Sequence, residues 1–211
     1  MPRREVIAAT AALTAQAPEF AAIVASAGPC ELRRGRPRRT HFAELARAIC
    51  YQQLAGAAAR AIHGRFEALF DGVPTPEAVL SASDEALQGV GLSGSKRASI
   101  RDLAQQVSAG TVDLERIGRR SDERVVEELT RVRGIGRWTA EMFLMFQLGR
   151  LDVWPVDDFG VRKGYARICG LAEQPTARAL APLGEPFRPY RSVAAWYCWR
   201  AAEDASLSDP R

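Results

Sequence analysis

Two adjacent carboxylates, Asp157 and Asp158, are the side chains of this sequence best placed to do chemistry. They follow Pro155, and a pair of aspartates in such a position is most often a helix N-cap. Backbone N–H groups and the helix dipole favour the ionised form of a carboxylate at a helix N-terminus. The pair therefore predicts a helix cap that carries a fixed negative charge.

A second chemical signal is the turn Arg133-Gly134-Ile135-Gly136, which separates two segments of helical spacing. Glycine permits a positive φ and leaves the backbone bare, so the N–H groups of the turn can approach another surface. The next helix adds unpaired N–H groups and the positive end of its dipole. The turn predicts an anion site, for which a DNA phosphate suits a basic protein, with Ile135 packed into the core. An ordinary corner between two helices is the alternative that this turn alone leaves open.

Several classes of enzyme site are disfavoured by what the sequence lacks. The two histidines, His41 and His63, have no carboxylate or cysteine partner at ligand spacing, which leaves little for a zinc site or a histidine-based triad. The cysteines stand singly, which argues against a disulfide framework, a zinc ribbon and an iron–sulfur cluster. They are expected to be buried, reduced thiols: Cys30, Cys50, Cys169 and Cys198. Only Lys96 and Lys163 are present for a Schiff-base mechanism.

Positive charge is concentrated in one segment of this mildly basic chain, whose formal net charge is +4 over 211 residues. Arginine occupies five positions within residues 33–39, where Gly35 and Pro37 interrupt the run. The segment fits a phosphate-contacting loop, extended in an A·T-rich minor groove, as well as it fits a solvated basic loop. The sequence leaves this choice open.

Helical spacing recurs along the chain, whereas no segment alternates apolar and polar residues over the length of a strand. Thr75, Ser83 and Ser121 each open a helix as N-caps, and Pro18 begins a second short helix within the first helical segment. The sequence predicts an all-α protein of about ten helices. The clearest periodic segments lie near residues 5–27, 42–50, 57–70, 100–107, 125–132, 138–148 and 193–202.

No linker is long enough to separate independent domains, so we expect a single helical module over residues 1–211. It would form two lobes with a cleft between them, one from residues 1–40 with 150–211 and the other from 41–149, and a loose tail at 204–211. No window approaches the ~18 uninterrupted apolar residues of a membrane span, and the first residues make a poor signal peptide. We therefore expect an intracellular protein with no membrane contact.

Four segments in unbroken order give the sequence a family resemblance. The glycine turn with its flanking helices resembles the helix–hairpin–helix of the DNA base-excision glycosylases, a superfamily also marked by a downstream aspartate. Residues 42–70, the turn Gly91-Leu92-Ser93 with Lys96, and residues 151–158 resemble it too. The similarity covers roughly residues 28–202. It is closest to the alkylation-repair branch, the DNA-3-methyladenine glycosylase II type, in a compact form without the extra N-terminal α/β domain.

The resemblance implies a monofunctional DNA glycosylase that excises alkylated purines, 3-methyladenine and also 7-methylguanine, by hydrolysis of the N-glycosidic bond after base flipping. The family's catalytic aspartate falls on Asp158, which leaves Asp157 as the cap. A carboxylate is suited to this reaction because the sugar acquires oxocarbenium character as the base leaves. A charge pair at ~4 Å in an effective dielectric of ~20 is worth about 4 kcal/mol, or close to three decades in rate.

Trp138 occupies the position where glycosylases that also cut the backbone carry a Schiff-base lysine. The resemblance therefore implies water as the nucleophile and no abasic-site lyase activity. An indole face also favours cationic N-alkylated purines, by ~0.5–2 kcal/mol. Further pocket aromatics of the family fall on Phe159 and Tyr190, whereas Met142 stands where an aromatic residue is expected. Core packing is the alternative for Trp138 and Phe159.

The resemblance also implies contacts with DNA. The intercalating side chain falls on Gln53 with Leu54 beside it, although Gln-Gln-Leu would equally suit a helix end. The hairpin and Lys96 would hold the DNA backbone, through Arg133, Gly134, Ile135, Gly136, Arg137 and Thr139. No iron–sulfur cluster or other cofactor is implied, while a monovalent cation, Na⁺ or K⁺, is compatible with the carbonyl groups of the hairpin.

Two alternatives remain open from the sequence. The pocket could accept deaminated, oxidised or mismatched bases, or the chain could be a non-catalytic helix–hairpin–helix protein that only binds DNA. A carboxylate repels phosphate, so Asp158 would be a poor choice for binding alone. We expect the partner to be double-stranded DNA with damaged bases, bound by a monomer in the bacterial cytoplasm at the nucleoid.

Overall fold

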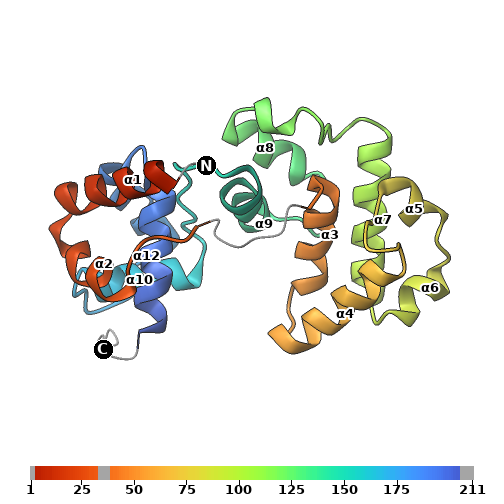
Figure 1. Ribbon diagram of the computed structural model, residues 1–211, viewed down its shortest axis with the longest axis horizontal. Coiled ribbons are helices and arrows are strands. Elements are labelled where there is room, and N and C mark those ends of the chain that lie inside the picture. The colour runs from red at the N-terminus through yellow and green to blue at the C-terminus, as the bar shows by residue number, and fades with distance from the viewer. Residues whose placement is uncertain (1–2, 33–38, 205–211) are drawn as a thin grey trace. The chain divides into compact units, whose positions relative to one another are not determined.

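The computed structural model describes residues 3–32 and 39–204, and within these ranges it contains α-helices and no strand (Figure 1). The all-α prediction is confirmed, with twelve α-helices in the described ranges against the ten or so expected. Contacts group the chain into two units. Unit 1 comprises Met1–Arg36 with Leu144–Arg211, and unit 2 comprises Pro37–Phe143. The arginines at 33–38 and the expected loose tail beyond residue 204 lie outside the described residues.

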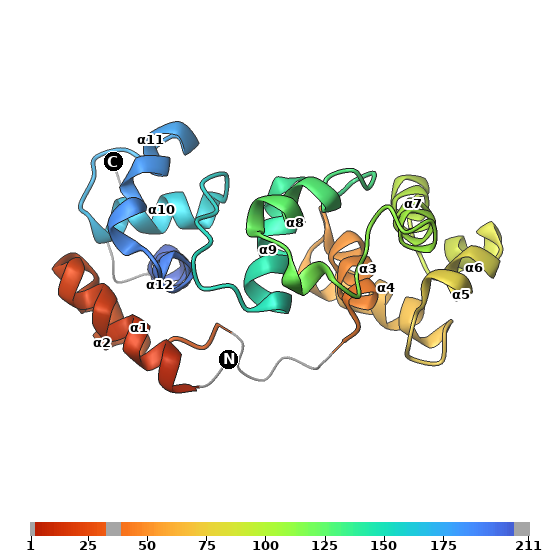
Figure 2. The same cartoon turned by 90° about the horizontal axis from the view of Figure 1, so that it is seen from above.

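Unit 1 is built around two helices that lie side by side in both ribbon views, α10 and α12 (Figures 1 and 2). Pro18 opens a short 3-10 helix, Pro18–Phe20, as the sequence predicts. Phe187 packs edge-on against Phe20 and Trp154 in the core, at ring-centroid distances of 5.2 and 5.6 Å. The α-helices are α1 (Arg3–Gln16), α2 (Ala21–Ala27), α10 (Phe159–Ile168), α11 (Ala177–Leu183) and α12 (Arg191–Glu203).

The close contact of α10 with α12 depends on Gly164. A Cβ at this position would overlap the backbone carbonyl of Cys198, so no other residue allows the two helices to approach as they do. The contact brings the N-terminus of α10 within reach of side chains from α12. It therefore positions the residue that caps α10.

Unit 2 begins many of its helices with the hydroxyl caps that the sequence predicts. The side-chain oxygens of Thr75, Ser83 and Ser121 each accept a hydrogen bond from the backbone N–H three residues later, and Ser93 does the same for α7. Figure 2 shows α5 and α6 beside α7, the longest helix of the unit. The α-helices are α3 (His41–Tyr51), α4 (Gly56–Ala68), α5 (Pro76–Ser81), α6 (Asp84–Gly89), α7 (Gly94–Ser108), α8 (Asp122–Leu129) and α9 (Arg137–Phe143).

The helix expected near residues 138–148 is not continuous. The helix α9 ends at Phe143, and Leu144–Leu148 form one turn of π-helix. A π-turn contains one more residue per hydrogen-bonded ring than an α-turn, so it rotates the side chains beyond it. The periodicity of the sequence shows an apolar face in either case, so it could not reveal this change.

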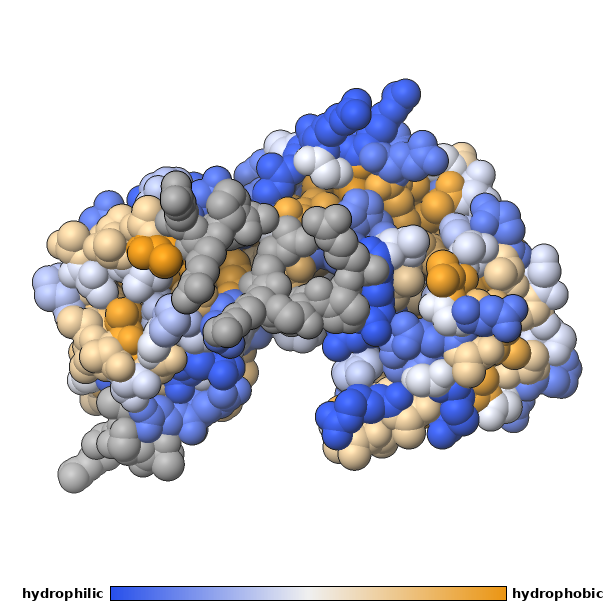
Figure 3. Space-filling model, in the orientation of Figure 1, coloured by the Kyte–Doolittle hydropathy of each residue, from blue (hydrophilic) through white to orange (hydrophobic). Residues whose placement is uncertain are grey.

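Charged side chains cover the face over α8, and the four cysteines differ in burial. The face over α8 is hydrophilic (Figure 3), where Arg124 and Arg131 both pair with Glu127. Cys50 is buried, and burial raises the pKa of its thiol to about 12. Cys198 is buried too, whereas Cys30 and Cys169 are partly exposed, so the expectation of buried thiols holds for two of the four.

Within the described ranges, no single helix has the length and apolar character needed to cross a membrane. The bent pair Glu5–Gln16 and Pro18–Ala27, which turns by 120°, meets that requirement by length and composition only.

Replacing Gly164 with alanine should destabilise the protein by about 3 kcal/mol, since the new methyl group would force α10 away from α12. Gly64→Ala is the matched control, because Gly64 lies inside α4 and a Cβ there would meet nothing within 4 Å. It should raise stability by about 0.5–1 kcal/mol through helix propensity. Thermal unfolding measures both changes, and equal midpoints for the two variants would contradict the close helix contact.

Candidate functional site

Asp158 is a buried carboxylate, 8% exposed, at the N-terminus of α10. Its Oδ1 atom accepts a hydrogen bond from the backbone N–H of Val161 at 2.8 Å, so Asp158 itself caps the helix. The assignment of the cap to Asp157 is therefore wrong. Asp157 lies one residue too early in the chain for a capping position and is exposed to solvent.

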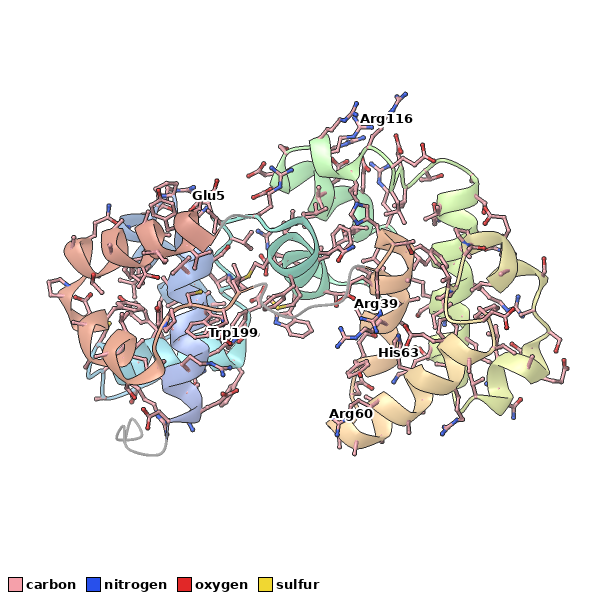
Figure 4. The ribbon with its side chains drawn as sticks, viewed as in Figure 1. Glu5, Arg39, Arg60, His63, Arg116 and Trp199 are labelled. Carbon is pink, nitrogen blue, oxygen red and sulfur yellow. The ribbon has the colours of Figure 1, made fainter. Side chains whose placement is uncertain are left out.

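A second donor reaches the same carboxylate oxygen from α12. The indole Nε1–H of Trp199 donates to Asp158 Oδ1 at 2.8 Å (Figure 4 labels Trp199). The indole is stacked on Phe146, at a centroid distance of 5.6 Å and an interplanar angle of 23°. Phe146 belongs to the π-turn that interrupts the expected helix. Two aromatic side chains therefore fix the position of the carboxylate in unit 1.

Gly160 provides the space that this arrangement needs. A Cβ on Gly160 would lie 2.8 Å from Trp199 Cδ1 and 3.2 Å from Asp158 Oδ1. Sequence reasoning missed both Trp199 and Phe146, because Trp199 is 41 residues from Asp158 along the chain. The glycine two residues after the carboxylate was the only local signal that something packs closely there.

The expected pocket aromatics differ in exposure. Trp138, the second residue of α9 in unit 2, is 46% exposed, and Phe159, the first residue of α10 in unit 1, is 64% exposed. Core packing, the alternative for these two side chains, is thus wrong. Met142 is half-buried on α9, and Tyr190 is half-buried immediately before α12.

The hairpin in unit 2 has the backbone that its first glycine predicts. Gly134 has φ of 78°, and a Cβ there would lie 2.5 Å from the hydroxyl oxygen of Ser99. Ile135 is 3% exposed, which confirms that it packs into the core. Gly136 has an ordinary φ, and a Cβ on it would meet nothing within 4 Å. The conformation therefore requires glycine at 134, whereas at 136 glycine leaves the backbone open to a partner.

The residues that flank the hairpin point in different directions. Arg137 is 64% exposed in its side chain and pairs with the buried Glu141 at 2.9 Å. The side chain of Arg133 lies at an exposed position, and its backbone N–H donates to Asp102 at 2.7 Å. Thr139 is 6% exposed, so its side chain faces the interior of unit 2 more than its surface.

A tight turn comes directly after α3, and we call its residues, Gln52–Ala55, the wedge turn. Gln53 has φ of 56°, a left-handed conformation that is uncommon outside glycine, and Leu54 is 38% exposed. The amide of Gln52 donates to the Gly134 carbonyl at 2.9 Å, so the structure brings the wedge turn and the hairpin together. Sequence reasoning singled out Gln53 and Leu54 here and missed the contact of Gln52.

Lys96 reaches the same region from α7. Its ammonium group donates to the Cys50 carbonyl at 2.7 Å, and burial lowers its pKa below the ordinary value. An ammonium group has three N–H donors, so this bond leaves room for a phosphate but also gives Lys96 a role within the protein.

Metal sites built from side chains are absent from the described part of the chain, where no group of three or more His, Cys, Asp and Glu side chains could hold an ion. The carbonyls of Val132 and Gly134 accept hydrogen bonds from Ile135 N–H and from Gln52. Because a carbonyl oxygen has two lone pairs, these groups remain compatible with a monovalent cation.

Comparison with known proteins finds a family whose model matches most of this chain. The family described as HhH-GPD superfamily base excision DNA repair protein matches residues 46–189. DNA-3-methyladenine glycosylase 1 of Schizosaccharomyces pombe is 36% identical over 180 residues, which cover 84% of this chain and 79% of that protein.

Solved structures that resemble almost the whole chain include two 3-methyladenine glycosylases. The S. pombe 3-methyladenine DNA glycosylase Mag1 in complex with abasic DNA has a TM-score of 0.85 and 34% identity, with 95% of this chain and 99% of that chain covered. A DNA-3-methyladenine glycosidase from Bacillus halodurans has a TM-score of 0.83 and 36% identity, with 98% and 91% covered.

Substitutions at Asp158 should separate its structural role from its charge. Asp158→Ala removes the acceptor of two hydrogen bonds and should lower stability by about 2 kcal/mol. Asp158→Asn keeps an oxygen that can cap the helix and accept from Trp199, so it should lose less than about 1 kcal/mol. Chemical denaturation measures the difference. An alanine variant as stable as the asparagine variant would contradict the two bonds to Oδ1.

Proposed function

Since the chain belongs to the HhH-GPD superfamily of base excision DNA repair proteins, we propose that it is a monofunctional DNA glycosylase that hydrolyses the N-glycosidic bond of alkylated purines. The observation that carries this function is the buried Asp158 carboxylate, held at one oxygen by the Val161 N–H and the Trp199 indole. The similar proteins are named for 3-methyladenine, which supports that base as the principal substrate, with 7-methylguanine as a second.

The carboxylate acts on the sugar of a flipped nucleotide. When the bond between C1′ and the purine breaks, its electron pair goes to the base, so a cationic N-alkylated purine leaves as a neutral molecule. The sugar becomes an oxocarbenium ion, which the negative charge of Asp158 stabilises. Water adds to C1′ and loses a proton to solvent. Because two donors already orient the carboxylate, no reorganisation is needed at the moment of reaction.

Aromatic side chains select the base. The side chains of Trp138 and Phe159 are exposed, and the face of an aromatic ring attracts the positive charge that alkylation places on a purine. Tyr190 and Met142 complete the proposed set of base contacts. Trp138 also carries no amine, so a Schiff base with the sugar cannot form at this position and the abasic strand stays uncut.

Unit 2 holds double-stranded DNA. The open backbone at Gly136 and the exposed guanidinium of Arg137 contact phosphates, together with Arg133. Gln53 and Leu54 enter the helix where the damaged nucleotide leaves it.

The protein would work as a monomer in the bacterial cytoplasm, at the nucleoid, since its substrate is DNA. It would need no iron–sulfur cluster or other redox cofactor, and a Na⁺ or K⁺ ion at the hairpin carbonyls would serve only to shape the turn. The carbonyls of Val132 and Gly134 would hold such an ion.

Asp158→Asn should lower the single-turnover rate of 3-methyladenine release by roughly two to three decades, because the charge that stabilises the sugar cation is lost. Affinity for the DNA should remain. Asp157→Asn, a change of the exposed neighbouring carboxylate, is the matched control and should leave excision unchanged. The DNA product of the native protein should stay uncut until alkali is added. Undiminished release by the Asp158 variant would refute the assignment.

Trp138→Lys should slow the release of cationic methylpurines by roughly tenfold or more, because an attractive ring face is replaced by a like charge. Trp138→Phe keeps a ring and should lose less. Excision from DNA that carries a neutral lesion, hypoxanthine, provides the comparison and should be less sensitive to the lysine. If methylpurine release were the same in all three proteins, Trp138 would not contact the base.

A further inference from the structure

The wedge turn and the hairpin are 82 residues apart in sequence but are directly bonded in unit 2. The side-chain amide of Gln52 donates to the Gly134 carbonyl at 2.9 Å and lies 3.5 Å from the Thr139 hydroxyl. Gln52 immediately precedes Gln53, the residue with left-handed backbone, and Gly134 is the glycine with positive φ in the hairpin. One side chain thus connects the two unusual backbone conformations.

Helix α7 supports both turns from one face. Lys96, Ser99 and Asp102 occur at three-residue spacing, which places them along one side of a helix. The Lys96 ammonium donates to the Cys50 carbonyl at the end of α3, just before the wedge turn. The Ser99 hydroxyl lies against Gly134, and the Asp102 carboxylate accepts from the Arg133 N–H at 2.7 Å. The two turns therefore have a common support.

The wedge turn needs such support. A left-handed backbone costs a residue other than glycine about 1–2 kcal/mol, so the chain around Gln53 would relax if nothing held it. Hydrogen bonds of about 0.5–1.5 kcal/mol each, one from Gln52 and one from Lys96, are of the size that offsets this cost. Removing either bond would leave the wedge turn free to change conformation, while the hairpin would keep its contacts with Ser99 and Asp102.

We propose that Gln52, together with Lys96, is a positioning residue that couples the wedge turn to the hairpin. The coupling rests on the proposed function. It fixes the distance between the hairpin, which binds a DNA phosphate, and the side chains of Gln53 and Leu54, which enter the duplex. Binding energy from the DNA backbone therefore helps to hold the damaged nucleotide in its flipped position. Lys96 acts through the Cys50 carbonyl and not through a phosphate.

Gln52→Met tests the coupling, because methionine has a similar length but no N–H donor. Gln105→Met is the matched control, since Gln105 lies exposed on α7. The measured quantity is the abasic preference, which is the ratio of the affinity for a duplex that contains a tetrahydrofuran abasic analogue to the affinity for the intact duplex. Gln52→Met should reduce this preference roughly three- to tenfold with intact-duplex affinity within about twofold of native. The control should show the native ratio. A native ratio in Gln52→Met, or no preference in the native protein, would overturn the coupling.

An assay of base excision distinguishes a failure of this coupling from a failure of the proposed glycosylase function on which it rests. If the native protein releases 3-methyladenine and Asp158→Asn does not, but Gln52→Met releases it at the native rate with the native abasic preference, the coupling fails and the function stands. If the native protein releases no base, the function fails, and the affinity ratio of Gln52→Met still decides the coupling.

Lys96→Met provides a second variant in case Gln52→Met folds poorly. A lysine that contacts phosphate contributes about one unit to the slope of log affinity against log salt, and its loss weakens binding to every duplex. A lysine that supports the wedge turn should leave that slope unchanged and reduce only the preference for the abasic duplex. A slope lowered by about one, with the preference intact, would assign Lys96 to phosphate and overturn its part in the coupling.

Discussion

The structure of unit 1 around the N-terminus of α10 depends on one buried carboxylate oxygen, Asp158 Oδ1, that accepts two hydrogen bonds at 2.8 Å. A buried charge is costly unless polar partners compensate for it, and here one donor comes from the backbone of Val161 and the other from the indole of Trp199. The Val161 donor is part of α10 itself, whereas the Trp199 donor depends on the contact of α10 with α12, which requires glycine at 164 and at 160. The buried carboxylate and the close contact between α10 and α12 are therefore parts of the same arrangement.

The segment that leads to Asp158 is also fastened to α12. Arg191, the first residue of that helix, pairs with Asp152 at 2.7 Å, and the Ser192 hydroxyl accepts from the Val153 N–H at 2.9 Å. The Ser192 hydroxyl in turn donates to the Arg150 carbonyl. A chain segment without regular structure becomes rigid when its own polar groups are satisfied by a neighbouring helix. The position of Asp158 is thus set from both sides, by the loop before it and by the helix that it caps.

In unit 2, too, side chains from a neighbouring helix hold an irregular segment in place. Two turns with left-handed backbone, at Gln53 and Gly134, are held by side chains from distant parts of the chain. Helix α7 contributes Lys96, Ser99 and Asp102 to this support, and none of the three is near the turns in sequence. In both units, one longer helix packed behind a turn or a helix start supplies side chains that maintain its local conformation.

Patterns along the chain alone determined the helical class, many of the helix starts and the identity of the hairpin. Hydroxyl caps such as Ser121 act on a backbone N–H three residues away, and Ile135 lies between two glycines that indicate a turn, so neighbouring residues suffice to predict them. Which of the two aspartates caps α10 depends on the exact residue at which the helix begins, and here that residue makes Asp158 the cap. Hydrophobic periodicity does not locate a helix start to within one residue.

Only the tertiary structure decided which side chains meet. The π-turn that carries Phe146, the bond from Trp199 to Asp158 and the bond from Gln52 to Gly134 join residues that no spacing rule relates. Their physical basis is packing between helices that are distant in sequence. Local interactions are set by the order of the residues, whereas long-range contacts exist only once the whole unit has closed around them.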